Sequence, residues 1–255
     1  MKIAILGSGN VATAYARKFM ESGNEITSVY SKHQQHAGEL AKLVNAKVAE
    51  NIKELIAGTD VLIISVSDHA IEELTATLGV VEIPVFHTAG SVSIHVLANT
   101  SSTYGVIYPL QSLRKNMKTI PEIPVFIDGN RPEAKALARK MGRCIGENVY
   151  EADDVSRKKL HMAAVFCSNF TNYMYVIAKK YTGSQNLPFT ALLPLIEQTA
   201  NRLRDYAPED MQTGPAVRGD FNIIQEHLNM LEDFPDWKEM YEDMSNRIFR
   251  EFNSN

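Results

Sequence analysis

The chain has 255 residues, of which 45% are apolar and 22% are charged. This composition fits a globular protein of one or two domains and excludes a disordered or low-complexity chain. A net charge of −4 excludes a global field that would attract nucleic acid or a membrane surface. No apolar run is long enough for a membrane span, and Cys144 and Cys167 form neither a disulfide framework nor a metal-binding pair. With no secretory cleavage pattern, we expect a cytoplasmic protein that binds no metal, no nucleic acid and no membrane.

Up to residue 151, short apolar runs alternate with helical stretches. The expected strands are Lys2–Leu6, Glu25–Tyr30, Ala46–Val48, Asp60–Val66, Val85–Thr88, Tyr104–Tyr108, Val125–Ile127 and Glu147–Tyr150. The expected helices are Val11–Glu21, Gly38–Leu43, Ile52–Ala57, His69–Leu78 and Arg131–Met141. This alternation predicts an α/β fold, namely a Rossmann-type doubly wound parallel sheet with helices on both faces.

Beyond residue 151 almost no strand-like run remains. The expected helices are Asp153–Lys180, Pro188–Asp205, Gly219–Glu232 and Asp236–Phe252, separated by glycine and proline. We therefore predict a dinucleotide-binding domain at 1–151 and an all-helical C-terminal domain at 152–255. The strongly apolar helical domain is small for the surface that it must bury, which favours a homodimer through it.

The turn after the first strand, Gly7-Ser8-Gly9-Asn10-Val11-Ala12, is a G-x-G-x-x-A motif that opens a helix. Its first glycine allows the tight turn, its second lets a diphosphate approach the backbone, and Ala12 keeps helix and strand close. The helix start also offers free N–H groups to phosphates. We predict that Gly7, Ser8, Gly9, Asn10 and Val11 bind a dinucleotide. The alternative is a glycine turn without a ligand.

The second strand ends in Tyr30-Ser31-Lys32, without the acidic residue that usually binds the ribose 2′-hydroxyl of NAD. A hydroxyl and an ammonium suit a 2′-phosphate, which a carboxylate would repel. Ser31 and Lys32 therefore favour NADP over NAD, and the missing acid also disfavours S-adenosylmethionine. Alternatively, Lys32 is an ordinary exposed lysine.

Polar residues follow two further strands, at the edge where a doubly wound sheet binds its ligand. Ser65, Val66 and Asp68 follow the fourth strand and are expected to contact the cofactor near its nicotinamide ribose. His87 ends the next strand and is expected near the nicotinamide ring, where it could donate a proton. Its alternative role is structural.

The expected helix Asp153–Lys180 is apolar around most of its circumference, which is typical of a buried helix. A polar stripe interrupts the apolar surface, and Cys167 falls on the apolar side, where we expect it in the core. The stripe would face substrate or form a polar seam between domains. In the first case His161 or Lys158 would donate a proton, with Asn169 beside them and Ser168 and Asn172 binding substrate.

The amino-terminal half resembles the NADP-binding domain shared by pyrroline-5-carboxylate reductase, 6-phosphogluconate dehydrogenase and F420-dependent NADP reductase. The resemblance rests on Gly7–Ala12, Ser31-Lys32 and Asp60–Val66. The whole chain resembles more closely a bacterial family of DUF2520-containing Rossmann-like proteins, described as NADP oxidoreductases. The matching pieces are Gly7–Ala12, His87-Thr88-Ala89-Gly90, Tyr108-Pro109-Leu110-Gln111, His161–Asn169 and Thr213–Asp220. This resemblance implies a Rossmann domain, a helical C-terminal domain and dimerisation, but no particular substrate.

One departure concerns the catalytic pair of the 6-phosphogluconate and β-hydroxyacid dehydrogenases, a Lys with an Asn four residues later. Here Lys158 is followed at that spacing by Met162, and His161 by Val165. The pair therefore cannot be transferred to this chain, so its chemistry is altered or absent.

We predict an NADP-dependent oxidoreductase that acts on a small, anionic substrate in the cleft between its domains. Arg218 would bind the anion in bidentate fashion, although its segment also reads as a loop in which Asp220 caps the next helix. The alternative function is a non-catalytic NADP(H)-binding sensor or interaction protein. A hydride shuttle between a deazaflavin and NADP is a third possibility, for which no second cofactor site is recognisable in the sequence.

Overall fold

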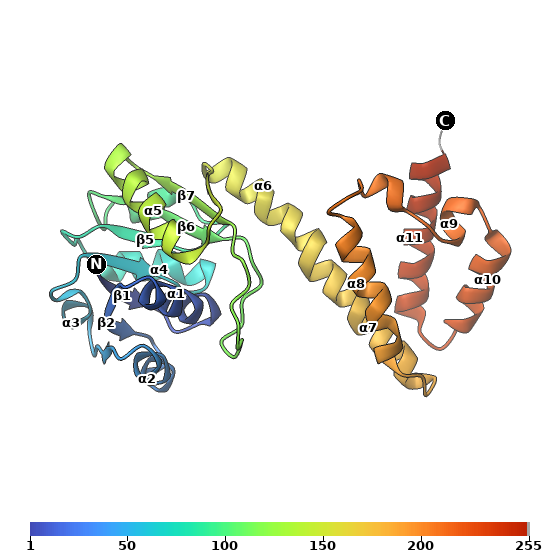
Figure 1. The fold of residues 1–255 in the computed structure, drawn as a ribbon, viewed down its shortest axis with the longest axis horizontal. Coiled ribbons are helices and arrows are strands. Elements are labelled where there is room, and N and C mark those ends of the chain that lie inside the picture. The colour runs from blue at the N-terminus through green and yellow to red at the C-terminus, as the bar shows by residue number, and fades with distance from the viewer. Residues whose placement is uncertain (254–255) are drawn as a thin grey trace. The chain divides into compact units, whose positions relative to one another are not determined.

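The computed structural model describes residues 1–253 (Figure 1). The chain divides into two compact units between Asn169 and Phe170, called here the N-terminal unit and the C-terminal unit. The expected domain boundary after residue 151 follows the last strand, and it stays a prediction.

An eight-stranded sheet forms the centre of the N-terminal unit. Its strands are β1 (Lys2–Leu6), β2 (Glu25–Tyr30), β3 (Lys47–Val48), β4 (Val61–Ile64), β5 (Val85–His87), β6 (Tyr104–Pro109), β7 (Val125–Gly129) and β8 (Val149–Glu151). They lie in the order β3-β2-β1-β4-β5-β6-β7-β8, and the first six run parallel. This is the strand order of a Rossmann fold, so the predicted fold class is confirmed.

The last two strands depart from the expected parallel direction. β7 pairs antiparallel with β6, with Val125 opposite Pro109 and Gly129 opposite Gly105. A parallel neighbour requires a crossover that returns the chain to the other end of the sheet, usually through a helix. No helix lies between Pro109 and Val125, so the chain turns back at the same end.

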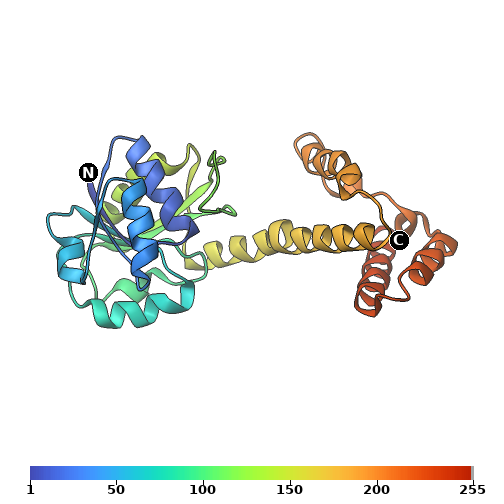
Figure 2. The ribbon, with the colours of Figure 1, turned by 90° about the horizontal axis from the view of Figure 1, so that it is seen from below.

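Helices cover both faces of the sheet (Figures 1 and 2). Alternate residues of each inner strand face opposite layers, which is why their sequences are continuously apolar. Ile3 and Ile5 pack with α1, α2 and α5, whereas Ala4 and Leu6 pack with α3 and α4. The helices of this unit are α1 (Asn10–Glu21), α2 (Gln34–Leu43), α3 (Ile52–Ile56), α4 (Asp68–Leu78), α5 (Pro132–Ile145) and α6 (Asp154–Ala164), with a 3₁₀ turn at Ile94–Leu97.

The described residues of the C-terminal unit form helices joined by turns and no strand, as predicted. Its helices are α7 (Thr171–Ser184), α8 (Leu193–Arg202), α9 (Pro215–Arg218), α10 (Phe221–Met230) and α11 (Pro235–Asn253), with 3₁₀ turns at Phe189–Leu192 and Glu209–Met211. The short helix α9 was not predicted. Asp220 occupies the N-cap position of α10, but its side chain makes no capping hydrogen bond. No helix within residues 1–253 combines the length and apolarity of a membrane span.

The expected helix Asp153–Lys180 differs from the prediction in two ways. It contains a π-helical segment at Val165–Phe170, which separates α6 from α7. It is also largely exposed in the single chain, because Arg157 is the only buried residue of α6 and α7 has none.

Candidate functional site

The glycine turn between β1 and α1 is shaped as the dinucleotide motif requires. Gly7 has φ +121°, and a Cβ built there would lie 2.0 Å from the carbonyl oxygen of Ser65. Any side chain at this position would therefore be both strained and blocked. A Cβ on Gly9 would meet no atom within 4 Å, so the backbone is open at the start of α1.

Hydrogen bonds join the turn to the end of β2, which is followed by Ser31 and Lys32, the residues that favour NADP over NAD. The Gly7 N–H donates to the Tyr30 carbonyl at 2.8 Å, and the Ser8 hydroxyl donates to the Ser31 hydroxyl at 2.9 Å. Lys32 is exposed and makes no hydrogen bond or ion pair with other residues in the described part of the chain. Its ammonium is thus free to meet a phosphate.

The ends of β4 and β5 lie beside this turn. The side chain of Val66 and the backbone of Ser65 surround Gly7, and the Thr88 hydroxyl donates to the Ser65 hydroxyl at 3.2 Å. The Asp68 carboxylate, at the start of α4, accepts a hydrogen bond from Ser91. The predicted cofactor contacts therefore come together around one edge of the sheet, and the open glycine turn fits a dinucleotide diphosphate.

His161 and Tyr108 form a hydrogen-bonded pair near this edge. The Tyr108 hydroxyl lies 3.0 Å from His161 Nδ1, joining the end of β6 to α6. Burial, followed by the nearby Asp68 charge, raises the pKa of Tyr108 to about 12. The phenol therefore keeps its proton at neutral pH. A Cβ on Gly90 would come within 2.6 Å of the Tyr108 ring, so glycine is required there.

A cavity of about 460 Å³ lies against this pair. Besides Tyr108 and His161, its walls include Gln111 from the loop after β6 and Ser168 and Asn169 from the π-helical segment. A histidine, a phenol, amides and hydroxyls thus surround a space of the size that a small molecule requires. No lysine or arginine is among the residues that line it.

The remaining predicted site residues, which are Lys158 and Asn172 of the polar stripe and the separately predicted Arg218, do not line this cavity. Lys158 is exposed and does not line the cavity, while Asn172 and Arg218 belong to the C-terminal unit. Cys167 was expected in the core, but it is exposed and lines the cavity. The apolar side of this helix, on which Cys167 was placed, is itself exposed in the single chain, with Phe166 and Phe170 more than half exposed, and this explains the error.

His87 lies in a different environment from His161. Its side chain is fully buried, Nδ1 accepts the Ala89 N–H at 3.2 Å, and Nε2 has no hydrogen-bond partner among the described residues. Burial, followed by the charge of Arg157, lowers the pKa of His87 to about 3. The His87 ring is therefore neutral near pH 7. A neutral ring does not suit the role of proton donor that the sequence suggested for His87.

Arg157 is a buried cation that the sequence did not reveal. Its guanidinium donates to the Asp154 carboxylate and to the Val92 carbonyl, both at 2.7 Å. It thereby ties α6 to the segment after β5. A lone arginine in a helix gives no sequence signal of burial, whereas Tyr108 could have been selected because it ends a strand, as His87 does.

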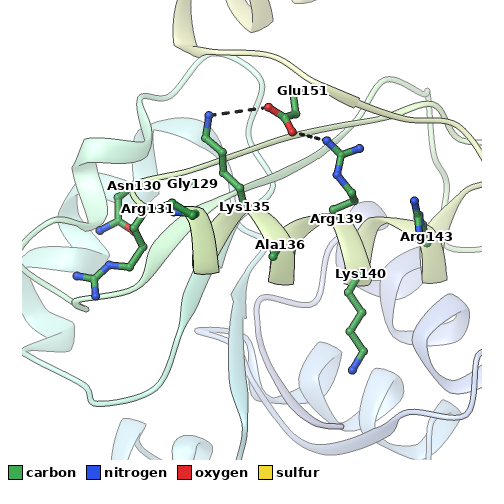
Figure 3. A pocket seen from close by; sticks show the side chains of 10 residues that line it. Gly129, Asn130, Arg131, Lys135, Ala136, Arg139, Lys140, Arg143 and Glu151 are labelled. Carbon is green, nitrogen blue, oxygen red and sulfur yellow. Dashed lines mark hydrogen bonds and ion pairs between the residues drawn. The ribbon is translucent and has the colours of Figure 1, made fainter.

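A second cavity, of about 1040 Å³, lies along α5 (Figure 3). Lys135 and Arg139 point toward Glu151, which forms an ion pair with each, while Lys140 points away from it. The cavity begins at Gly129, which pairs with Gly105 near the start of β6. It therefore opens near the sheet edge opposite the glycine turn, and none of the predicted site residues lines it.

The described residues include no cluster of His, Cys, Asp or Glu suited to a metal ion.

Comparison with known proteins places this geometry in a family. Residues 123–248 match the model of a domain of unknown function, DUF2520, and residues 2–85 match the model described as NADP oxidoreductase, coenzyme F420-dependent. A Bacteroides fragilis protein described as a "putative NADP oxidoreductase" is 38% identical, with a TM-score of 0.91 and 98% of each chain covered. The chain belongs to the DUF2520-containing, Rossmann-like NADP oxidoreductase family. The predicted family is confirmed.

More distant structures share the fold. A 1-pyrroline-5-carboxylate reductase from Streptococcus pyogenes is 17% identical, with a TM-score of 0.64 and 98% of each chain covered. A reductive aminase from Aspergillus terreus, in complex with NADPH and ethyl-5-oxohexanoate, is 18% identical, with a TM-score of 0.69. That match covers 98% of this chain and 94% of the aminase. A search of curated proteins finds no match.

Proposed function

We propose that this protein is an NADP-dependent oxidoreductase that reduces or oxidises a small molecule bound beside Tyr108 and His161. The observation that carries the proposal is this hydrogen-bonded pair, which borders a cavity in a unit that also holds an open dinucleotide turn. The family description and the oxidoreductases of similar fold support it. When bound, the nicotinamide would supply or accept a hydride.

The chain's own residues would supply the proton that accompanies hydride transfer. With a neutral ring, the Tyr108 hydroxyl donates to His161 Nδ1, which leaves the hydrogen of the ring on Nε2. When the ring gains a second proton, Nδ1–H donates to the Tyr108 oxygen and Nε2–H becomes the acid. His161 is the proposed proton donor, and Tyr108 orients its ring.

Ser31 and Lys32 are proposed to select NADP. Replacing Lys32 with alanine is expected to weaken NADPH binding by roughly 1–3 kcal/mol and to leave NADH binding unchanged, because only NADPH carries the 2′-phosphate. Calorimetry with both nucleotides measures this, with Lys47→Ala as an exposed control. Equal affinities for the two nucleotides, unaltered by Lys32→Ala, would contradict the proposed preference.

Turnover is tested by following NADPH oxidation with a panel of imines, ketones and 2-oxo acids. On the substrate that this panel identifies, His161→Gln is expected to lower kcat roughly 10²–10⁴-fold with little change in NADPH affinity. Lys159→Gln, an exposed neighbour on α6, is the control. Full activity of the His161 variant would assign the proton to another group or to solvent.

The proposal has two finer parts, which concern the charge of the substrate and the assembly of the protein. An anionic substrate held by Arg218, in a cleft between the two domains, is a proposal from the sequence. The residues that line the cavity supply no positive charge of their own. Assembly as a homodimer through the C-terminal unit is proposed because, among its described residues, only Ala216, Leu228 and Ser245 are buried in the single chain.

A non-catalytic NADP(H)-binding sensor is the second candidate, and the position of Lys158 favours it. This lysine lies outside the cavity and lacks the Asn partner of the related dehydrogenases. NADPH binding without oxidation by any member of the substrate panel would support the sensor over the enzyme.

A further inference from the structure

The loop between β6 and β7 lies against the start of α1, where the dinucleotide turn ends. The Lys115 backbone N–H donates to Asn10 Oδ1 at 3.0 Å, and Asn10 is the first residue of α1. Because β6 ends at the same sheet edge as β1, this loop belongs to the edge at which a Rossmann fold binds its ligand.

Several contacts hold the loop in this position. The Arg17 guanidinium, from α1, donates to the Met117 carbonyl at 2.8 Å and to the Lys118 carbonyl at 3.3 Å. The Leu113 side chain is buried in the layer formed with α1. At its base, the Gln111 side chain donates to the Glu122 carbonyl at 3.0 Å. The loop is thus ordered by the protein alone.

The loop is positively charged, although the chain as a whole is not. Residues 110–121 contain Arg114, Lys115 and Lys118 and no acidic residue. All three side chains are exposed, and within residues 1–253 they make no hydrogen bond or ion pair through their charged groups. Lys115 itself makes the backbone contact with Asn10, and Arg114 is the residue before it.

The glycine turn cannot balance the charge of a diphosphate by itself. Residues 7–12 include no cation, and the start of a helix offers only roughly half an elementary positive charge. The remaining negative charge has to be met by side chains or by solvent. Arg114 and Lys115 are the cations that the fold brings to this helix start by a backbone hydrogen bond.

We propose that the loop Leu110–Glu122 completes the dinucleotide site, with Arg114 and Lys115 binding the diphosphate that the Gly7–Ala12 turn receives. This inference rests on the proposed NADP-dependent function. It assigns the loop a role different from that of Lys32, because the diphosphate is common to NADPH and NADH, whereas the 2′-phosphate is not.

The test is calorimetry of NADPH and NADH with the full chain and the double variant Arg114→Gln/Lys115→Gln. Both nucleotides are expected to bind roughly 10-fold or more weakly, by the same factor, with a smaller dependence on salt than in the wild type. Lys140→Gln removes an exposed charge from α5 and is the control, expected to bind as the wild type does. Arg114→Lys/Lys115→Arg, which keeps both charges, is expected to retain most of the affinity, and thermal melting checks that each variant is folded.

Three results would overturn the inference. Unchanged affinity of the folded double variant for both nucleotides would show that the loop does not contact the cofactor. A loss confined to NADPH would show that these cations bind the 2′-phosphate instead. A wild-type protein that binds neither nucleotide would refute the proposed function itself, and the two failures are therefore distinguishable.

Discussion

Two buried side chains near the candidate site, His87 and Arg157, each contain a nitrogen without a hydrogen-bond partner among the described residues. A buried polar atom without a partner has lost its hydrogen bonds to water and has formed none within the protein, which costs free energy. His87 avoids the larger cost of a buried charge by staying neutral. The arrangement ties the stability of the protein to the protonation state of one imidazole.

Stability is therefore expected to fall in mild acid. The pKa of His87 is about 3 in the folded chain and 6.5 in the unfolded chain, so the unfolded state binds the proton first. The His87 contribution is complete above pH 6.5 and is lost as the pH falls toward 3. At pH 5 the loss is about 2 kcal/mol relative to pH 7.

Urea unfolding at pH 7 and pH 5 measures this loss. His87→Gln is expected to flatten the dependence on pH, whatever its effect at pH 7, while His36→Gln, at an exposed position, should leave it unchanged. An equally steep acid loss in the His87 variant would assign the effect to other groups.

At the scale of elements, α6 is positioned by one buried guanidinium. Arg157 binds the Asp154 carboxylate on its own helix and the Val92 carbonyl on the segment after β5. The same helix carries His161 to Tyr108. A residue without contact to the cavity thus fixes the helix that provides the proposed proton donor.

Arg157→Met is expected to destabilise the protein by about 3 kcal/mol, because Asp154 would lose its ion pair and the carbonyls of Val92 and Ala152 would each lose a donor. Urea unfolding at neutral pH measures the change. Lys158→Met, at the next and exposed position, is expected to change stability by less than about 0.5 kcal/mol. Equal effects of the two substitutions would show that the buried pair contributes nothing net.

An element could be predicted from the sequence when the residues of that segment alone carry a recognisable pattern. Strands such as β4 were recognisable because burial on both faces leaves a continuous apolar run. The antiparallel direction of β7 also has a local signal in the sequence, because no helix is expected between Tyr108 and Val125. α9 has four residues and is too short to show a period.

The candidate site was predictable only where a motif encodes it. The Gly7–Ala12 motif specifies a backbone shape, which the structure has. The pairing of Tyr108 with His161 joins positions 53 residues apart, so no local pattern contains it. The exposure of Cys167 depended on how much of its helix the rest of the chain covers, which the spacing of residues within one helix does not determine.

At the scale of the whole molecule, the C-terminal unit leaves many apolar side chains uncovered in the single chain. Large apolar side chains such as Leu187, Leu195 and Phe221 are more than half exposed in the single chain. Exposed apolar side chains of this kind are typical of an interface, and a two-fold homodimer is the commonest arrangement that would cover them.

Sedimentation at micromolar concentration is therefore expected to give a particle with twice the mass of one chain. Leu195→Glu in the C-terminal unit should shift the protein toward the monomer, because it places a charge in the interface. Val80→Glu changes an even more exposed apolar residue in the N-terminal unit and should leave the dimer intact. A wild-type monomer would contradict the proposed assembly.

The central position of β1 has a consequence for synthesis of the chain. Among the eight strands β1 comes first in the chain, and β2 and β4 occupy its two edges in the finished sheet. Until β4 emerges from the ribosome, one edge of an almost wholly apolar strand has no partner, and such edges promote aggregation. Parallel pairing between distant strands also forms slowly. Translation that stops before Val61 is therefore expected to yield fragments that aggregate more readily than the full chain.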